Sequence, residues 1–430
     1  MYPEKESSIL ELKESVKSNY LKTVSAFANY HDGEILFGIA DTGEVVGIEN
    51  SEQKKLDIEN RVNDNITPRP KFILKIKEIN NKDIIVLKVF KSKMPPYTYQ
   101  NKAYQRTDTA TVPIDSVAFS RLVLEGTNTS FDELEANVTD LKFEKLELEL
   151  KKLMGISALT PDMQRTMNLR TNNSYTNAGM LLADKNDYKY GVDMVRFGSS
   201  DNIFIERMEA RGESLLFQYE KAMEMFDKWY APYEEVVDFY RVSRLQIPRV
   251  AFREALANAL IHRDYLLKAN IRISLREEGI EIISPGGLPS GITKEAFTRG
   301  QYSQIRNETI AETFRRLQII EKYGTGVKRI IEAYQPFKQA PIFDEIGGQA
   351  VKVFLPKVTY SDSKEEINDY EYRILTYINE KIETTASEIL EANGGEPEHL
   401  EHILSKLHRE NKIIKNGQAS DIKYVSVISR

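Results

Sequence analysis

Three carboxylates near the start of the chain are of the type that binds a divalent cation, and a lysine lies beside one of them. Glu11 and Lys13 lie two positions apart, so a strand over residues 9–13 places both side chains on one face. A carboxylate can hold Mg²⁺ or Mn²⁺, and a lysine beside it can orient or activate a water molecule. Glu6 and Asp41, the latter at a strand end, are two further carboxylates that such a metal site could use.

The spacing of these carboxylates sets a condition on the backbone. Glu6 precedes Glu11 by a distance that fits neither a strand nor a helix face, so the site requires a bend at residues 7–8. The alternative interpretation is a row of surface carboxylates in which Lys13 serves as an ion-pair partner.

A second group of polar residues follows a helical spacing. Glu254, Asn258 and His262 are four positions apart and therefore share one stripe of a helix. An asparagine in this position could bind Mg²⁺ between phosphates, and a glutamate one turn earlier could activate water. The alternative is a polar stripe on a half-buried helix.

Glycines in the same region could surround phosphates with backbone N–H groups. They form two pairs, Gly286 with Gly287 at a strand end and Gly324 with Gly326 before a helix. The sequence has no P-loop motif, so a P-loop nucleotide site and helicase activity are not predicted.

Composition limits the class of protein. A chain of 430 residues predicts two or three domains. The absence of cysteine excludes disulfides, Cys-ligated zinc and thiol catalysis, and it fits a reducing cytosol. No apolar run reaches the roughly 20 residues of a membrane helix, and the charged start is unlike a signal peptide, so we expect a cytoplasmic protein without membrane contact.

The net charge of −6 means that nucleic-acid binding would require a local basic patch. One candidate patch mixes cations and aromatic rings, which suits phosphate contacts and base stacking. Its members are Lys88, Lys91, Lys93, Arg106, Tyr97, Tyr99 and Tyr104. The alternative is that the lysines lie on the solvent-exposed face of a strand and that the tyrosines pack inside the domain.

The hydrophobic pattern predicts mixed α/β structure in most of the chain. We expect the first region to contain a strand, a helix and hairpins, over residues 9–13, 20–29, 34–40 with 44–48, 72–77 with 84–90, and 97–106. The acidic residues 131–154 predict a solvated connecting helix. Further on, the pattern predicts a helix and strands over residues 251–260, 271–275 and 280–284.

From Asn368 the pattern is helix, helix, helix and hairpin, which is the order of a winged helix. The third helix begins with acidic residues, which repel phosphates. These are Glu396, Glu398 and Glu401. DNA contact would therefore depend on lysines of the wing, and a protein-contact role is the alternative.

Three ordered blocks in the first region resemble the AlbA-type domain shared with Schlafen proteins. The blocks are Glu6-Ser-Ser-Ile-Leu-Glu11-Leu-Lys13, Val24-Ser-Ala-Phe-Ala-Asn29 and Gly38-Ile-Ala-Asp41-Thr-Gly43-Glu-Val-Val-Gly47. The resemblance covers residues 6–106. It implies that Glu6, Glu11 and Asp41 match the carboxylates of metal-dependent RNA cleavage in nuclease members. The sequence departs from the family at Asp32-Gly33, where the family has two glycines.

Residues 177–337 resemble a GHKL ATPase-like module that is often labelled as the C-terminal domain of RecG-type helicases. The resemblance implies ATP binding by Glu254, Asn258 and the glycines. Such ATPases hold the adenine amino group with an aspartate, and this sequence has Ser284 in that place. The departure removes the charged acceptor for adenine.

Together these observations predict an α/β (α+β) multidomain protein: a mixed-sheet Schlafen AlbA-like domain, a GHKL-like α/β sandwich after a helical connector, and a winged helix. The predicted boundaries are residues 1–125, 126–360 and 361–430. The predicted function is a nucleic-acid-binding, ATP-responsive regulator of the transcriptional type that acts as a homodimer on RNA or DNA. The alternatives are a Mg²⁺- or Mn²⁺-dependent nuclease in phage defence and a structural assembly protein.

Overall fold

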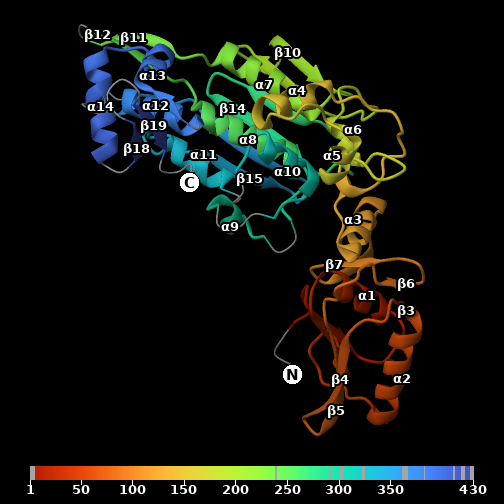
Figure 1. The fold of residues 1–430 in the computed structure, drawn as a ribbon. Helices are drawn as coiled ribbons and strands as arrows, with labels where there is room; N and C mark the ends of the chain where they lie inside the picture. The colour runs from red at the N-terminus through yellow and green to blue at the C-terminus, as the bar shows by residue number, and fades with distance from the viewer. Residues whose placement is uncertain are drawn as a thin grey trace. The chain divides into compact units, whose positions relative to one another are not determined.

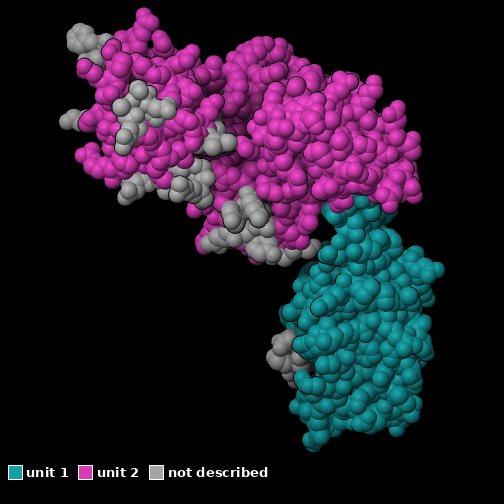
Figure 2. Space-filling model, in the orientation of Figure 1, with its two compact units in different colours: residues 1–134 teal, residues 135–430 magenta. Residues whose placement is uncertain are grey.

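The computed structural model describes residues 5–237, 240–289, 292–300, 304–321, 325–360, 367–381, 383–409, 412–417 and 422–426. The chain forms two compact units, unit 1 (residues 1–134) and unit 2 (residues 135–430), which Figure 2 shows in teal and magenta. Both units combine helices with mixed sheets, so the predicted α+β class is confirmed. The boundary predicted after residue 125 falls inside helix α3 (Ser116–Thr127). Within the described residues, no helix is both long and apolar enough to cross a membrane.

Unit 1 is built on a four-stranded sheet (Figure 1). Its order is β1 (Leu10–Lys13), β2 (Gly33–Phe37), β5 (Lys82–Val89) and β4 (Phe72–Ile79). Strands β1 and β2 are parallel, and the other pairs are antiparallel. The β4–β5 hairpin confirms one prediction, and its turn residues Asn80 and Asn81 both have positive φ, as this tight turn requires.

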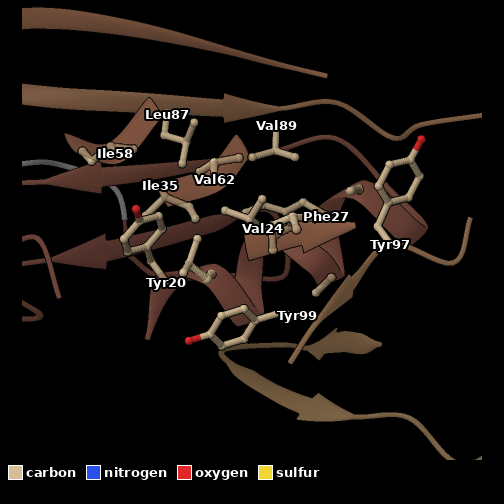
Figure 3. Close-up of a cluster of buried hydrophobic side chains, with 14 of the residues drawn as sticks. Tyr20, Val24, Phe27, Ile35, Ile58, Val62, Leu87, Val89, Tyr97 and Tyr99 are labelled. Carbon is tan, nitrogen blue, oxygen red and sulfur yellow. The ribbon is translucent and has the colours of Figure 1, made fainter. Parts of the chain in front are cut away.

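Each face of this sheet is covered by apolar residues. Helices α1 (Tyr20–Tyr30) and α2 (Ser51–Asn65) pack on one face and form the main core with Ile35 and Leu87 (Figure 3). A smaller cluster on the other face includes Leu12. Because β1 is covered on both sides, Glu11 is buried as well as Leu10 and Leu12.

Two predicted hairpins differ from the observed pairing. Strand β2 pairs with β1 and β5, and the segments that flank residues 41–43 are joined by a bridge from Ile39 to Val45 and a few backbone hydrogen bonds, without forming two strands. The expected hairpin at 97–106 is limited to one bridge, between Tyr99 and Lys102 across a tight turn, and the flanking residues form short pairs with other segments. The pairs are β3 (Ile66–Thr67) with β6 (Thr98–Tyr99) and β7 (Tyr104–Thr107) with β8 (Ala110–Pro113).

The continuous helix predicted for residues 131–154 is wrong. A single turn, η1 (Phe131–Glu133), is separated from helix α4 (Glu144–Met154). The carboxylate of Asp184 accepts hydrogen bonds from the first backbone N–H groups of α4, so that the helix begins at Glu144. Its inner residues, including Leu146, are buried, so α4 is a packed element of unit 2.

Unit 2 contains a six-stranded sheet in the order β10 (Phe204–Ala210), β9 (Val192–Phe197), β13 (Ile271–Leu275), β14 (Gly279–Pro285), β16 (Ala350–Pro356) and β15 (Ile342–Ile346). Strands β9 and β13 are parallel, and the other neighbours are antiparallel. The predicted helix and strands at 251–260, 271–275 and 280–284 are confirmed.

Helices that carry candidate site residues lie beside this sheet. Helix α8 (Arg249–His262) packs on β14, where the hydroxyl of Ser284 donates to the carbonyl of Ala259 at 2.8 Å. Helix α11 (Gly326–Tyr334) packs on α8. The other elements before the C-terminal region are α5 (Pro161–Thr166), α6 (Asn177–Leu182), α7 (Leu215–Trp229), α9 (Lys294–Thr298), α10 (Glu308–Arg316) and the hairpin of β11 (Tyr233–Val237) and β12 (Tyr240–Arg244).

The C-terminal elements follow the predicted order. Thr385 caps α13 with a capping box, and Gly394 ends that helix. The apolar stripe of α14 is buried, with Leu400 and Leu407 among its members. The elements are α12 (Ile367–Glu380), β17 (Thr384–Thr385), α13 (Ala386–Asn393), α14 (Pro397–Arg409), β18 (Ile413–Asn416) and β19 (Lys423–Ser426), with sheet order β17-β19-β18.

Candidate nucleotide pocket and nucleic-acid interface

Glu11 on β1 is the centre of a buried ion-pair cluster. Its Oε2 accepts hydrogen bonds from Arg106 Nη1 at 2.6 Å and from Thr23 Oγ1 at 2.5 Å. Its Oε1 lies 2.8 Å from the ammonium of Lys13. Two cations therefore neutralise one carboxylate in a site that excludes most solvent.

Glu6 joins this cluster through a turn of the chain. Ser7 and Leu10 form a backbone bridge, which supplies the bend that the sequence required. The bend places Glu6 Oε1 2.9 Å from the backbone N–H of Leu12 and 3.7 Å from Lys13 Nζ. Glu6 and Glu11 thus both contact Lys13.

Asp41 does not complete a metal site with these residues. It is exposed at the turn after Ala40. In the described part of the chain, no group of three or more His, Cys, Asp or Glu side chains is placed to hold a metal ion. In this structure Asp41 therefore does not join Glu6 and Glu11, and the metal site stays a prediction. Both oxygens of Glu11 are engaged by Lys13, Arg106 and Thr23, so Glu11 could bind a metal only if these contacts changed.

Arg106 also differs from the predicted phosphate contact. Its side chain is 1% exposed, and it donates to the carbonyls of Ser7 and Leu10 at 2.8 and 3.1 Å as well as to Glu11. The guanidinium holds the N-terminal bend against β1. It is not available to a phosphate in this structure.

The aromatic part of the predicted patch is likewise internal. Tyr97, Tyr99 and Tyr104 are at most 7% exposed and belong to the main core of unit 1, where Figure 3 shows the first two. They are packed tyrosines and do not offer a stacking surface. Of the lysines, Lys91 pairs with Glu125 at 2.9 Å, and Lys93 is exposed.

A different row of cations lies along the outer edge of the unit 1 sheet. We call Lys71, Lys75, Lys77 and Lys88 the basic edge. The register pairs Ile73 with Lys88, Lys75 with Val86 and Lys77 with Ile84, so β4 presents its lysines on the face that carries Lys88. Lys71 and Lys88 both lie over the ring of Phe90, at 5.3 and 5.7 Å from its centre.

The charges of the basic edge are only partly neutralised. Lys88 lies 3.6 Å from a carboxylate oxygen of the exposed Glu34. Lys75 and Lys77 are exposed, and neither forms an ion pair with any of the described residues. The basic patch predicted from the sequence includes Lys88 but misses Lys71, Lys75 and Lys77, although the alternation of residues 71–77 in a strand could have indicated them.

Unit 2 contains a pocket between α8, α11 and the sheet. Glu254, Asn258 and Gly326 line one part of it, as the sequence predicts. Gly286 and Gly287 also line it, whereas Gly324 lies outside the described residues. The remaining wall is mostly apolar, with Ile282, Phe297, Ile330, Phe343, Val351 and Val353 among its residues. A ligand with a flat apolar part and a charged part fits this division.

Close packing explains the glycines of the pocket. A Cβ at Gly326 would lie 2.7 Å from the Asn258 side-chain nitrogen. The start of α11 therefore packs directly against Asn258, the residue predicted to bind Mg²⁺. A Cβ at Gly286, whose φ is +107°, would lie 2.4 Å from Arg306 Nη1. Arg306 donates to the carbonyls of His262 and Gly287 at 2.7 and 2.8 Å and fixes this corner of the wall.

Glu254 is buried and already paired. Its Oε1 lies 3.0 Å from Arg329 Nη1 and 3.1 Å from Arg253 Nη2. Sequence reasoning missed Arg329, because it is far from Glu254 along the chain and only the packing of α11 on α8 brings the two together. In this arrangement Glu254 is a charge partner, and its predicted role in water activation is not supported.

His262 lines the same pocket and is uncharged near neutral pH. Burial lowers its pKa from 6.5 to about 4, and the neighbouring Arg306 guanidinium acts in the same direction. Its neutral ring therefore suits the apolar wall.

Replacing His262 with Gln is expected to reduce the loss of stability in acid. The folded pKa is below the unfolded one, so the unfolded chain binds more protons between these values. The stabilising contribution is complete above the unfolded pKa and is lost as the pH falls toward about 4. Between about pH 7 and pH 4.5, the variant should lose roughly 2–3 kcal/mol less than the wild type.

Denaturation followed by the fluorescence of Trp229, the single tryptophan, measures this difference in unit 2. The same pH dependence in both proteins would contradict the assignment of a depressed pKa to His262.

Comparisons with known proteins agree with the resemblances seen in the sequence. Residues 6–115 match the family described as "Schlafen, AlbA_2". Residues 268–355 match the family described as "Putative ATP-dependent DNA helicase recG C-terminal", which includes the pocket glycines but not α8. A search of curated proteins finds no match.

Two solved structures are similar to the chain. The DIP2311 protein from Corynebacterium diphtheriae is 18% identical, with a TM-score of 0.48 over 97% of this chain and 92% of that chain. The N-terminal domain of an ATP-dependent DNA helicase RecG-related protein from Nitrosomonas europaea is 20% identical, with a TM-score of 0.20 over 24% of this chain and 82% of that chain. By the family matches, the chain combines a Schlafen AlbA_2 segment at residues 6–115 with a RecG C-terminal-like segment at residues 268–355, which associates it with nucleic-acid-related and ATP-related families.

Proposed function

We propose that this chain is a nucleic-acid-binding regulatory protein, with the contact surface on the basic edge of unit 1 and a nucleotide site in unit 2. The observation that carries the proposal is the exposure of Lys75 and Lys77 without ion pairs among the described residues, in a segment that matches Schlafen AlbA_2. Cations that are free of carboxylate partners can neutralise phosphates at the smallest cost. Lys71 lies before Lys75 and Lys77 on the same side of the strand, and Lys88 adds a cation on the neighbouring strand β5, opposite Ile73.

The nucleotide part of the proposal rests on the pocket in unit 2. Asn258, the start of α11 and the adjacent apolar wall suit a nucleotide such as ATP, with Mg²⁺ bound between its phosphates and Asn258. Ser284 supplies a hydroxyl in place of a carboxylate, and its proton is donated to Ala259. We therefore expect weak discrimination of the base.

A metal-dependent nuclease remains the second candidate, because Glu6 and Glu11 do gather at Lys13. Because both carboxylate oxygens of Glu11 already pair with Lys13, Arg106 and Thr23, we favour a protein that binds nucleic acid over one that cleaves it. The C-terminal elements, which we interpret as a winged helix, have a secondary role in binding. Lys406 of α14 lies 2.5 Å from the buried Glu371, and the helix begins with acidic residues. We expect its removal to change nucleic-acid affinity only modestly.

Replacing Lys75 and Lys77 together with Gln is expected to weaken nucleic-acid binding by roughly tenfold or more at low salt, because phosphate neutralisation supplies most of the affinity. Fluorescence anisotropy of labelled single-stranded RNA, single-stranded DNA and duplexes measures the effect. The matched control changes Lys54 and Lys55 to Gln, because these lysines of α2 already pair with Asp57 and Glu52.

The control pair should bind as the wild type does. Equal losses in the two double variants would mean that only net charge matters, and unchanged binding by the Lys75 and Lys77 variant would refute the proposed surface.

A further inference from the structure

Two carboxylates line the unit 2 pocket beside the start of α11. Glu254 comes from α8, and Glu321 comes from the segment that precedes the helix. The side chain of Glu254 is 3% exposed. An ionised carboxylate in such surroundings repels a nearby phosphate strongly, because little water screens the interaction. The pocket can accept a polyphosphate only if these charges are neutralised.

Arg329 contacts both of these carboxylates. Its Nη1 lies 3.0 Å from Glu254 Oε1, and its Nη2 donates to Glu321 Oε1. The guanidinium is 18% exposed and lies one turn after Gly326, where α11 meets Asn258. One side chain therefore joins the helix, the preceding segment and α8 at the polar part of the pocket.

The second cation at Glu254 has a different position. Arg253 Nη2 lies 3.1 Å from the same oxygen, but Arg253 belongs to α8, and among the described residues no ion pair joins it to Glu321. Loss of Arg329 would leave Glu254 with one partner and would remove the described partner of Glu321. The polar part of the pocket would then become more negative.

We propose that Arg329 determines whether the pocket accepts a polyphosphate, by neutralising Glu254 and Glu321. This inference rests on the proposed nucleotide-binding function and adds a specificity-determining residue to it. The ligand class is a nucleoside polyphosphate, and the effect of Arg329 grows with the number of phosphates. Glu254 acts in this arrangement through its charge.

The test compares adenosine, AMP, ADP and ATP with Mg²⁺ by calorimetry in the full chain. Arg329→Gln should lower the affinity for ATP by about tenfold or more and leave that for adenosine within about twofold. Lys328→Gln is the matched control, because Lys328 is the next residue of α11, is 64% exposed and pairs with Glu332. The control should retain the affinities of the wild type.

A rescue variant separates charge from packing. Arg329→Gln combined with Glu254→Gln should recover most of the ATP affinity, because the unneutralised carboxylate is gone. Arg329→Lys keeps the charge and should retain the preference for ATP, so it tests the inference if Arg329→Gln unfolds. If Arg329→Gln lowers the affinities for adenosine and ATP equally, or if the double variant does not recover ATP affinity, the inference about Arg329 is overturned while the proposed nucleotide site is not. No binding of any of the four ligands by the wild type would overturn the proposed function and the inference with it.

Discussion

Replacing Glu11 with Gln is expected to destabilise unit 1 by about 3–5 kcal/mol. The substitution leaves the Arg106 guanidinium buried without its counter-charge, and Lys13 loses the closer of its two carboxylate partners. Hydrogen exchange at β1 and at the N-terminal bend measures the change locally. The fluorescence of Trp229 reports on unit 2 and should not change.

Glu34→Gln provides the control for this prediction. Glu34 lies on the neighbouring strand β2 and pairs with Lys88, but both side chains are about 40% exposed (39% and 43%), so the loss should stay below about 1 kcal/mol. If Glu11→Gln costs no more than Glu34→Gln, the buried cluster does not stabilise the domain as described.

A test of nucleic-acid cleavage should therefore use a substitution at Asp41 and not one at Glu11. A loss of nuclease activity in Glu11→Gln would not identify a metal ligand, because the fold of unit 1 would weaken at the same time. Asp41 is exposed at a turn, so Asp41→Asn removes a carboxylate without breaking a described contact. Cleavage that depends on Asp41 would favour the nuclease candidate over binding alone.

Replacing Gly326 with Ala is expected to lower ATP affinity by roughly 30-fold, or about 2 kcal/mol. The new Cβ would lie 2.7 Å from the Asn258 side-chain nitrogen and 3.0 Å from its oxygen, so the amide must turn away from the pocket. Gly326 is the first residue of α11, so alanine should stabilise the helix by less than the roughly 0.5–1 kcal/mol of an interior position. The affinity for ATP should therefore fall while the stability of unit 2 changes little.

Calorimetry and denaturation of the same samples check this prediction. Asn258→Ala should cause a similar loss of affinity, and the double variant should lose little more than either single variant, because both act through one amide. ATP affinity that is unchanged in Gly326→Ala would show that Asn258 does not contact the nucleotide.

Local patterns in the sequence predicted the local parts of the structure. The hairpin that turns at Asn80 and the helical stripe of Glu254 and Asn258 both depend on residues a few positions apart. The helix expected at 131–154 was wrong, because its start depends on Asp184 from another segment.

The partners of the candidate site residues could not be predicted in this way. Arg106 meets Glu11 from 95 positions away, and Arg329 meets Glu254 from 75 positions away. No periodicity relates such residues, since only the folded sheet and the packing of α11 on α8 bring them together. For this reason the sequence alone predicts a phosphate contact at Arg106 and a water-activating carboxylate at Glu254.

The salt dependence of nucleic-acid binding tests the central proposal most directly. Dissociation constants of the full chain are measured from about 50 to about 200 mM salt, for the wild type and for the variant with Gln at Lys75 and Lys77. We expect a steep loss of affinity in the wild type and a slope that is smaller by about one unit for each lost phosphate contact in the variant. If nucleotide binding in the unit 2 pocket regulates nucleic-acid binding, ATP and Mg²⁺ should change the dissociation constants of the wild type. No measurable binding at low salt, or equal slopes for the two proteins, would contradict a nucleic-acid surface on the basic edge.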